Sequence, residues 1–238
     1  EGSLFVCVKG GSFDGHMAAA EMLEKGAAAV VCERDLGLGD RQIIIENSRE
    51  LYGKLCAAWF GHPERRLTMI GVTGTNGKTT TKELIRAVLS VKYNVTATEG
   101  NLNNSIGVPL TLLKINSETQ LAVVEMGASH PGDIKELVDI ALPNYGLITN
   151  VGKAHLLGFG SFEGVKATKG ELYDDLKARG KFIFLNAQDD DLRQMAEERG
   201  FCTSDEAHCK PYAEGRVSAC APFVEFQWRE GEAQPWHT

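Results

Sequence analysis

The sequence predicts an α/β protein with a mostly parallel central sheet and helices on both faces. Short apolar runs alternate with helical patterns along most of the 238 residues, which favours parallel strands joined by crossover helices. A glycine-rich loop ending in Gly-Lys-Thr lies between one such strand and its helix. The alternation stops near residue 62 and then restarts, so we expect a smaller α/β domain to precede the central one.

The first alternating stretch, residues 1–63, is expected to form the smaller domain. Strands are predicted at 4–8, 27–32 and 42–46, a helix is predicted at 16–25, and a second helix is predicted to follow Ser48. Gly26 suits the position after a helix end, where a left-handed backbone is common. Ser48 can cap the second helix, whose apolar face would contain Leu51, Leu55, Ala58 and Trp59.

The segment Gly61-His-Pro-Glu-Arg-Arg66 breaks the pattern, and we place the domain boundary there. Residues 64–238 are expected to form the central domain, with Pro131 just inside one of its helix starts. Its predicted strands are 68–73, 94–98, 120–126, 145–151 and 181–186, and its predicted helices are 78–92, 104–115, 131–141, 161–179 and 189–199. The tail from Val217 to Trp228 is expected to form strands, with a turn at Gly231.

The loop within Gly71-Val-Thr-Gly-Thr-Asn-Gly-Lys-Thr-Thr80 predicts a phosphate site. Its glycines let backbone N–H groups turn toward one point, and the helix that follows adds its positive dipole end. Lys78 can reach the β- and γ-phosphates of a nucleotide, and the Thr79 hydroxyl can hold Mg²⁺. The common spacing would put a glycine at position 72, where this chain has Val72. The simpler alternative is a tight strand-to-helix turn.

The nucleotide is expected to contact the loop and the first turn of its helix, at Gly74, Thr75, Asn76, Gly77, Lys78, Thr79 and Thr80. The helix that follows has apolar residues in a helical pattern at Leu84, Ile85, Val88 and Leu89. That pattern predicts that one helix face packs on the sheet.

Two further candidates follow neighbouring strands. Glu125 ends an apolar strand, and a carboxylate at that edge of a phosphate-loop sheet is well placed for Mg²⁺. The alternative is a solvated strand end. His155 follows the next strand and is a second candidate ligand, although a lone histidine is usually structural or exposed.

Lys169 lies at the centre of an apolar helix stripe formed by Phe162, Val165, Leu172 and Leu176. An ammonium on a core-facing stripe is costly unless it is paired or chemically changed. Three interpretations stay open: a lysine that reaches the surface, an ion pair, or a covalent modification that inverts the charge.

The segment between one strand and the next helix carries Asn101, Asn103, Asn104 and Ser105. Small polar residues beside glycines suit a substrate-binding loop, but they also suit an ordinary turn. From the residues alone the prediction stops at a Mg²⁺–ATP enzyme of unknown substrate.

Composition excludes other classes of function. The net charge of −7 argues against sequence-independent nucleic-acid binding. No apolar run approaches the roughly 20 residues that span a bilayer, and no secretory signal is visible. The six cysteines include no Cys-x-x-Cys pair, so reduced thiols in the cytoplasm are expected.

The motifs together resemble the Mur ligase family. The loop at 71–80 is similar to the ATP loop of that family, including the departure at Val72. Three segments are similar to the branch that adds D-alanyl-D-alanine: Glu99-Gly-Asn-Leu-Asn-Asn-Ser-Ile-Gly107, Glu125-Met-Gly-Ala-Ser-His-Pro-Gly-Asp-Ile134, and Ala154-His-Leu-Leu-Gly-Phe-Gly-Ser161 with Lys169-Gly-Glu171.

The N-terminal segments Leu4-Phe-Val-Cys-Val-Lys-Gly10 and Phe13-Asp-Gly-His16 resemble the uridine-nucleotide domain of the same branch. The resemblance therefore implies a smaller UDP-substrate domain at 1–63 and the central ATPase domain at 64–238. It also implies a longer protein, in which the first domain has an earlier start, the central domain continues, and a C-terminal ligase domain follows.

The resemblance implies a cytoplasmic, monomeric ligase of peptidoglycan precursor synthesis. ATP would phosphorylate a UDP-N-acetylmuramoyl-tripeptide, and D-alanyl-D-alanine would attack the acyl phosphate. Lys78, Lys169 and His155 would be catalytic, and Thr79, Glu125 and His155 would be metal ligands. Lys169 matches the lysine that this family carbamylates, and the asparagine loop would contact substrate.

Two alternatives stay open. One is a different Mur ligase, adding meso-diaminopimelate or lysine, which the segments at 100–107 and 125–134 argue against. The other is a nucleotide-binding module without ligase activity. The third residue of the tripeptide is not defined by the sequence.

Overall fold

The computed structural model describes residues 2–10, 13–59, 61–153, 156–201, 214–219, 225–230, 235 and 237. The chain forms two compact units, Glu1–Phe184 and Leu185–Thr238. Among the described residues, no helix has the length and apolar character needed to cross a membrane. The division into domains near residue 63 stays a prediction.

The N-terminal part of the first unit is a small parallel sheet of β1 (Leu4–Val6), β2 (Ala29–Cys32) and β3 (Gln42–Ile44), in that order. A 3-10 turn (Gly15–Ala18) leads into α1 (Ala19–Glu24), and Gly26 follows this helix with a φ of +101°. Another 3-10 turn (Gly39–Arg41) precedes β3. These elements enclose a core of Cys7, Ala19, Leu23, Ala27, Val30 and Cys32.

Helix α2 (Ser48–Trp59) buries a different face from the one predicted. Gly53, Cys56 and Ala57 are its buried apolar positions, and Ala58 and Trp59 are exposed. The helix packs against α4 and α5, described below. A Cβ added at Gly53 would lie 2.6 Å from the Ile140 side chain. Helices α2 and α5 can therefore approach closely because Gly53 has no side chain.

The start of α2 also differs from the prediction. The Asn47 side-chain oxygen accepts from the backbone N–H groups of Arg49 and Glu50, at 3.1 Å each. Ser48 instead donates from its N–H and hydroxyl to Glu33 Oε1, at 2.9 and 2.8 Å. Asn47 therefore caps the helix, and Ser48 joins it to the segment after β2.

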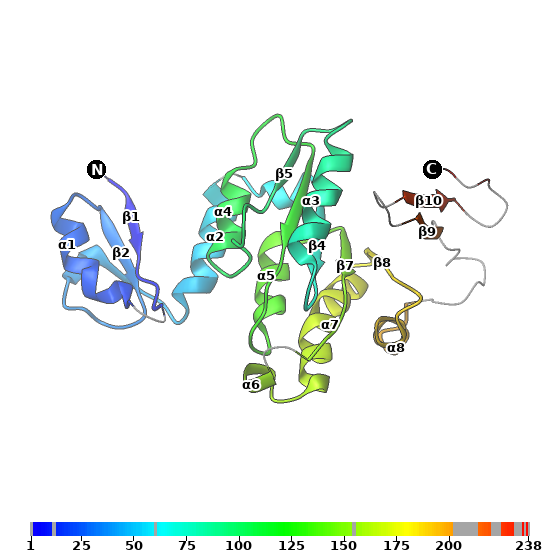
Figure 1. The fold of residues 1–238 in the computed structure, drawn as a ribbon. Helices are drawn as coiled ribbons and strands as arrows, with labels where there is room; N and C mark the ends of the chain where they lie inside the picture. Colours follow the sequence, from blue (N-terminus) through cyan, green and yellow to red (C-terminus); the bar gives the residue numbers. More distant parts are fainter. Residues whose placement is uncertain are drawn as a thin grey trace. The chain divides into compact units, whose positions relative to one another are not determined.

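The main sheet has five parallel strands in the order β5-β6-β4-β7-β8 (Figure 1). The strands are β4 (Thr68–Thr73), β5 (Val95–Ala97), β6 (Leu121–Glu125), β7 (Tyr145–Ile148) and β8 (Phe182–Phe184). This confirms the predicted fold class. The strand order reverses on either side of β4, and ligands of open α/β sheets bind at such a switch point.

Helices cover both faces of this sheet. Alternate strand residues point to opposite faces. On one face Ile70 and Val72 pack with Ile85 and Leu89 of α3 (Lys78–Leu89). On the other face a Cβ added at Gly71 would meet α7. That second layer contains α4 (Gly107–Leu113), α5 (Asp133–Ala141) and α7 (Phe162–Ala178). Helix α5 contacts both α4 and α7, and all three helices contact the sheet.

Three local details depart from the predictions. Two of the four apolar residues expected to pack from α3, Leu84 and Val88, are 62% and 70% exposed. Pro131 precedes α5 by two residues, because Gly132 is the N-cap with a φ of +89°. A 3-10 turn (Pro63–Arg65) and the short α6 (Leu156–Phe159) were not anticipated.

The second unit contains α8 (Asp190–Glu198) and an antiparallel pair, β9 (Glu214–Ala219) with β10 (Glu225–Arg229). Asp189 caps α8, since its side chain accepts from the N–H of Leu192 at 3.1 Å. Strands were predicted in this tail, and β9 and β10 confirm them. The predicted turn at Gly231 lies outside the described residues.

Candidate nucleotide site

The glycine loop after β4 has a backbone that two of its glycines make possible. Gly74 has a φ of +143°, and a Cβ there would lie 1.9 Å from Thr149 Oγ1. Gly77 has a φ of +77° and forms the N-cap of α3. Both φ values lie in the region where side chains are strained. The loop therefore turns directly into a helix N-terminus, as a phosphate site requires.

The loop after β7 supports the glycine loop. Thr75 N–H donates to the Asn150 carbonyl at 3.0 Å, and Asn76 N–H donates to Asn150 Oδ1 at 3.1 Å. In return the Asn76 carbonyl accepts from Thr149 Oγ1 at 2.6 Å. Gly152 N–H donates to Thr75 Oγ1 at 2.8 Å. The sequence reasoning missed these supporting residues, although it placed their loop at the same sheet edge.

Lys78 curls back over the loop. Its Nζ donates to the carbonyls of Gly74 and Thr75, at 2.9 and 3.0 Å. The side chain is half-buried, and the next two residues, Thr79 and Thr80, are exposed in the first turn of α3. The expected nucleotide contacts, 74–80, thus form one continuous turn, and their role stays a prediction.

Glu125 ends β6, opposite Val72 of β4, and is 1% exposed. Its Oε1 accepts from Asn103 Nδ2 at 2.8 Å, and its backbone N–H donates to Thr98 Oγ1 at 3.0 Å. Within the described residues, the buried Oε2 has no hydrogen-bond partner. A buried carboxylate oxygen without a donor is a ready ligand for a cation.

A second buried lysine lies beside this carboxylate. Lys82 is 0% exposed, and its Nζ donates to the Thr98 carbonyl at 2.5 Å. It forms an ion pair with Glu83 at 2.9 Å and lies 4.0 Å from Glu125 Oε2. Sequence reasoning missed Lys82. The available signal was its spacing, three residues before Ile85 and seven before Leu89, the residues of α3 that pack on the sheet.

These residues fit a magnesium ion shared with a nucleotide. Mg²⁺ is usually held by one or two carboxylates together with substrate phosphates and water. Glu125 offers an oxygen that has no hydrogen-bond partner among the described residues, and Thr79 offers a hydroxyl at the start of α3. Across the described ranges no group of three His, Cys, Asp or Glu residues forms a metal cage. The other candidate ligand, His155, lies outside the described residues.

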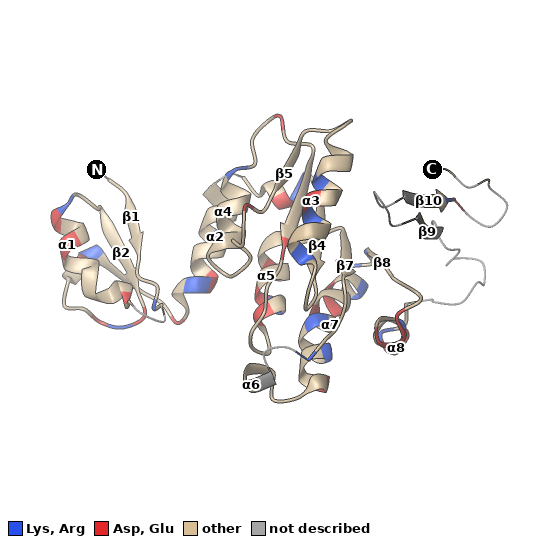
Figure 2. Ribbon diagram, in the orientation of Figure 1, with Lys and Arg blue, Asp and Glu red and all other residues tan. Residues whose placement is uncertain are grey.

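Lys169 of α7 is buried, with 3% exposure, so the interpretation in which this lysine reaches the surface is wrong. Val165, Leu172 and Leu176 are fully buried on the same helix. The Lys169 Nζ lies 5.8 Å from the centre of the Phe159 ring. Burial, and secondarily the positive charge of Lys78, lower the pKa of Lys169 from 10.5 to about 8. Basic residues of both α3 and α7 are visible in Figure 2.

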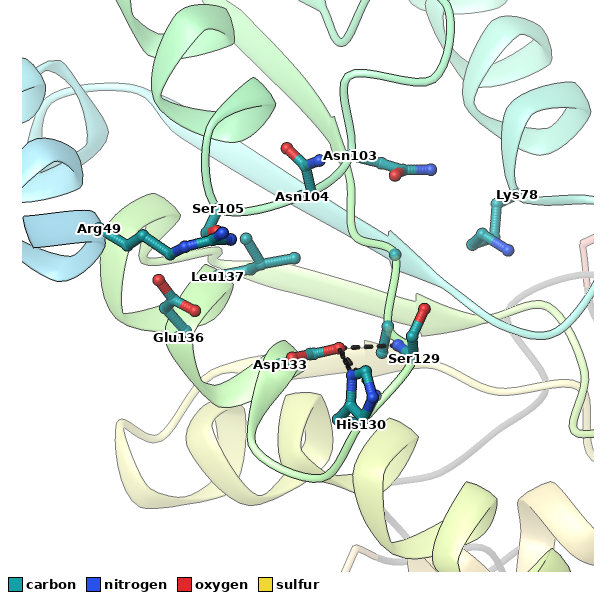
Figure 3. Close-up of a pocket in the computed structure, with 12 residues that line it drawn as sticks. Arg49, Lys78, Asn103, Asn104, Ser105, Ser129, His130, Asp133, Glu136 and Leu137 are labelled. Atoms are coloured by element: carbon teal, nitrogen blue, oxygen red, sulfur yellow. Dashed lines mark hydrogen bonds and ion pairs between the residues drawn. The ribbon is translucent and has the colours of Figure 1, made fainter. Parts of the chain in front are cut away.

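A polar cavity of about 450 Å³ extends from Lys78 toward α2 and α5 (Figure 3). Of the predicted asparagine loop, Asn103, Asn104 and Ser105 line it. Asn101 is exposed. Asn104 has a structural part as well, because its Oδ1 accepts from the N–H groups of Ile106 and Gly107 at the start of α4, at 3.1 and 2.9 Å.

The opposite wall of the cavity is the start of α5. Asp133 Oδ2 accepts from the N–H groups of Ser129 and His130, at 2.7 and 2.8 Å (Figure 3). Arg49 and Glu136 stand at the end remote from Lys78. Burial raises the pKa of Glu136. The cavity therefore joins the phosphate loop to a region with charges of both signs.

A parallel sheet whose central strand runs through a glycine loop into a covering helix defines a P-loop nucleotide-binding protein. The sequence pattern of the Mur ligase middle domain matches residues 72–219. This chain belongs to the Mur ligase family.

Three relatives illustrate the likeness. The UDP-N-acetylmuramoyl-tripeptide--D-alanyl-D-alanine ligase of Escherichia coli (strain K12) is 42% identical over 192 residues, which cover 80% of this chain and 41% of that protein. A crystal structure of MurF from Acinetobacter baumannii has a TM-score of 0.77 at 29% identity, covering 98% of this chain and 51% of that one. The structure of MurF ligase from Thermotoga maritima in complex with ADP has a TM-score of 0.64 at 41% identity. The match covers 74% of this chain and 40% of that one.

The chain thus spans about two fifths of the length of the curated relatives it matches.

Proposed function

We propose that this chain forms the nucleotide-binding part of a cytoplasmic, ATP-dependent ligase of peptidoglycan precursor synthesis. The enzyme would join D-alanyl-D-alanine to UDP-N-acetylmuramoyl-tripeptide. One observation carries the proposal: the phosphate loop with Lys78 and the unpartnered carboxylate oxygen of Glu125 end two adjacent strands of one sheet. The named relatives support the substrates, and the ADP complex of the Thermotoga maritima protein supports the nucleotide.

The reaction follows from the chemistry of its substrates. An oxygen of the tripeptide's terminal carboxylate bonds to the γ-phosphorus of ATP, and the bond from that phosphorus to the bridging oxygen breaks to release ADP. The amine of D-alanyl-D-alanine then attacks the carbonyl carbon of the acyl phosphate. Phosphate leaves from the tetrahedral intermediate, and the nitrogen loses a proton. Phosphorylation is needed because a carboxylate oxygen is a poor leaving group.

In this proposal the chain's own residues mainly position charge. Lys78 would turn from the carbonyls of Gly74 and Thr75 to the β- and γ-phosphates. Thr79 and Glu125 would hold Mg²⁺, with His155 as a ligand of a second ion. Magnesium supplies neutralisation of the charge that builds on the transferring phosphoryl group.

Lys169 would act as a carbamate. The lysine nitrogen bonds to the carbon of CO₂ and loses a proton, which converts a cation into an anion. This needs the neutral amine, and with a pKa of about 8 roughly a fifth of Lys169 is neutral near pH 7.4, against roughly one in a thousand at 10.5. A carbamate would support the second metal ion, whereas an ammonium would repel it.

The cavity beside Lys78 would take the peptide end of the UDP substrate, with Asn103, Asn104 and Ser105 along one wall. In this proposal the asparagine loop keeps its predicted substrate role, and Asn101 is the exposed member of that loop.

The decisive assay is ADP release by the full-length protein. Release that requires both the UDP-tripeptide and D-alanyl-D-alanine supports the proposal. Release that instead requires meso-diaminopimelate or lysine with a UDP-dipeptide identifies another Mur ligase. Nucleotide binding without release under any of these conditions indicates a module without ligase activity.

A test of the carbamate uses ¹³C-labelled bicarbonate. A carbamate carbon signal is expected in the wild-type protein and not in Lys169→Met. Identical spectra for the wild type and Lys169→Met would exclude the carbamate and leave the proposed ligase activity unaffected.

A further inference from the structure

The proposed reaction leaves one fully buried charge unused. Lys82 is 0% exposed and lies one helical turn after Lys78 on α3, on the helix side that faces the sheet. Burying an ammonium is costly unless good partners compensate it. A methionine or leucine side chain would carry no such desolvation cost, so the charge itself calls for an explanation.

Lys82 is fixed by groups that do not belong to the nucleotide loop. Its Nζ donates to the Thr98 carbonyl at 2.5 Å and pairs with Glu83 at 2.9 Å. Thr98 directly follows β5 and is 1% exposed, and its backbone N–H donates to the Val123 carbonyl of β6 at 3.0 Å, so this anchor is held against the sheet. The Thr98 hydroxyl also accepts from the backbone N–H of Glu125, at 3.0 Å. Thr98 therefore holds both the Lys82 ammonium and the backbone N–H of Glu125.

The Glu125 side chain lies between a neutral hydrogen-bond donor and a positive charge. Asn103 donates to Oε1 at 2.8 Å, which is a direct hydrogen bond. Lys82 lies 4.0 Å from Oε2, which is within ion-pair range but beyond a hydrogen bond. Among the described residues Oε2 has no hydrogen-bond donor. The arrangement fixes the carboxylate by attraction on both sides while leaving one oxygen free for a ligand.

We propose that Lys82 is a positioning residue for Glu125, the magnesium ligand in the proposed function on which this inference rests. Lys82 cannot bind a cation itself. It orients the buried carboxylate so that Oε2 is presented without reorganisation when the metal–nucleotide complex arrives. Partners that orient metal ligands in this way typically change metal affinity by about 10- to 100-fold when they are removed.

The test measures metal binding rather than turnover. In the full-length protein with saturating ADP, free Mn²⁺ is followed by electron paramagnetic resonance during a titration. Lys82→Met keeps an unbranched side chain, one heavy atom shorter, and removes the charge. We expect its Mn²⁺ dissociation constant to rise by about 10- to 100-fold. ADP affinity in EDTA should stay within about twofold of wild type, because Lys78 and the loop are unchanged.

The matched control is Arg86→Met. Arg86 lies one turn further along α3 and also pairs with Glu83, at 2.7 Å, but it is exposed. The Arg86→Met change removes a cation from Glu83, the acidic partner that Lys82 also has, and leaves the surroundings of Glu125 unchanged. The Mn²⁺ affinity should therefore not change. If Lys82→Met fails to fold, Lys82→Gln keeps an N–H donor for the Thr98 carbonyl and gives the same comparison.

Three different results would overturn the inference. If Glu125→Gln weakens Mn²⁺ binding but the folded Lys82 variants do not, Lys82 is a structural counter-ion and the proposed metal site stands. If Glu125→Gln itself binds Mn²⁺ like wild type, Glu125 is no ligand, and the metal site of the proposed function fails together with the role of Lys82. Equal losses of Mn²⁺ affinity and metal-free ADP affinity in the Lys82 variants would indicate general damage to the site and also refute positioning.

Discussion

Replacing Lys169 by methionine should stabilise the protein in CO₂-free buffer. Burial lowers the pKa of Lys169 from 10.5 to about 8, so the folded state disfavours the ammonium. At about 1.4 kcal/mol per pKa unit, that shift corresponds to roughly 3 kcal/mol of lost stability at pH 7. Because the side chain is 3% exposed, solvent screening discounts little of this. Methionine has a similar length and an apolar stem, so it removes the cost without leaving a cavity.

The pH dependence has a definite sign. The cost is fully present below pH 8, where Lys169 is charged in both states. It decreases between pH 8 and 10.5, where the folded protein has released the proton that the unfolded chain still binds. The advantage of Lys169→Met should therefore fall from about 3 kcal/mol at pH 7 to about 1 kcal/mol at pH 9.5.

Urea unfolding followed by circular dichroism measures this difference. For a slope of 1–3 kcal/mol per molar, roughly 3 kcal/mol moves the midpoint by about 1 M or more. Lys177→Met, at an exposed lysine of the same helix, is the control and should change stability by less than about 0.5 kcal/mol. A Lys169→Met protein no more stable than wild type at pH 7, or an advantage that does not shrink at pH 9.5, would refute the reasoning.

Three further predictions follow from the same geometry. Lys82→Met should lower the free energy of unfolding by about 3 kcal/mol in urea, since it leaves the buried Glu125 carboxylate without its counter-charge, and Lys82→Met/Glu125→Gln should recover much of that loss. Gly74→Ala should weaken ADP binding in calorimetry at least tenfold, because its φ is +143° and its new Cβ would lie 1.9 Å from Thr149 Oγ1; unchanged affinity would contradict the loop geometry. Lys78→Ala should abolish ADP release in the full-length protein while its melting temperature stays within a few degrees, and wild-type release from a folded variant would exclude Lys78 from the site.

Most strands of the main sheet were predictable because they are short apolar runs between helical patterns. In β4 and β6, Met69, Val72, Val123 and Val124 are fully buried, so almost every position had to be apolar. The glycine loop was predictable for a different reason. Its chemistry is local in sequence, and the structure needs a left-handed backbone where the glycines stand.

What supports the loop was not predictable in the same way. Thr149 and Asn150 contact the glycine loop because β7 lies directly beside β4, whereas the two strands are separated by more than 70 residues in sequence. Strand order is needed to bring them together, and alternation alone does not give the order. The buried face of α2 was predicted wrongly for a similar reason. Ile140 of α5 packs directly on Gly53, which has no side chain, and this contact depends on an element far along the sequence.

The two buried lysines show where pattern reasoning ends. Lys169 was found because buried apolar residues precede and follow it on one stripe, so its charge stood out against them. Lys82 was hidden, because Leu84 and Val88 on the same helix are apolar yet exposed, and they drew the predicted face away from it. An amphipathic pattern assigns a lysine to solvent unless a partner is known. Besides Glu83, which is its neighbour in sequence, Lys82 is near the Thr98 carbonyl and the Glu125 carboxylate, which lie at the ends of two strands that α3 packs against. The same physics gives the two lysines opposite predictions. Removing the Lys169 charge, which burial disfavours, should stabilise the fold, and removing the Lys82 charge, which compensates Glu125, should destabilise it.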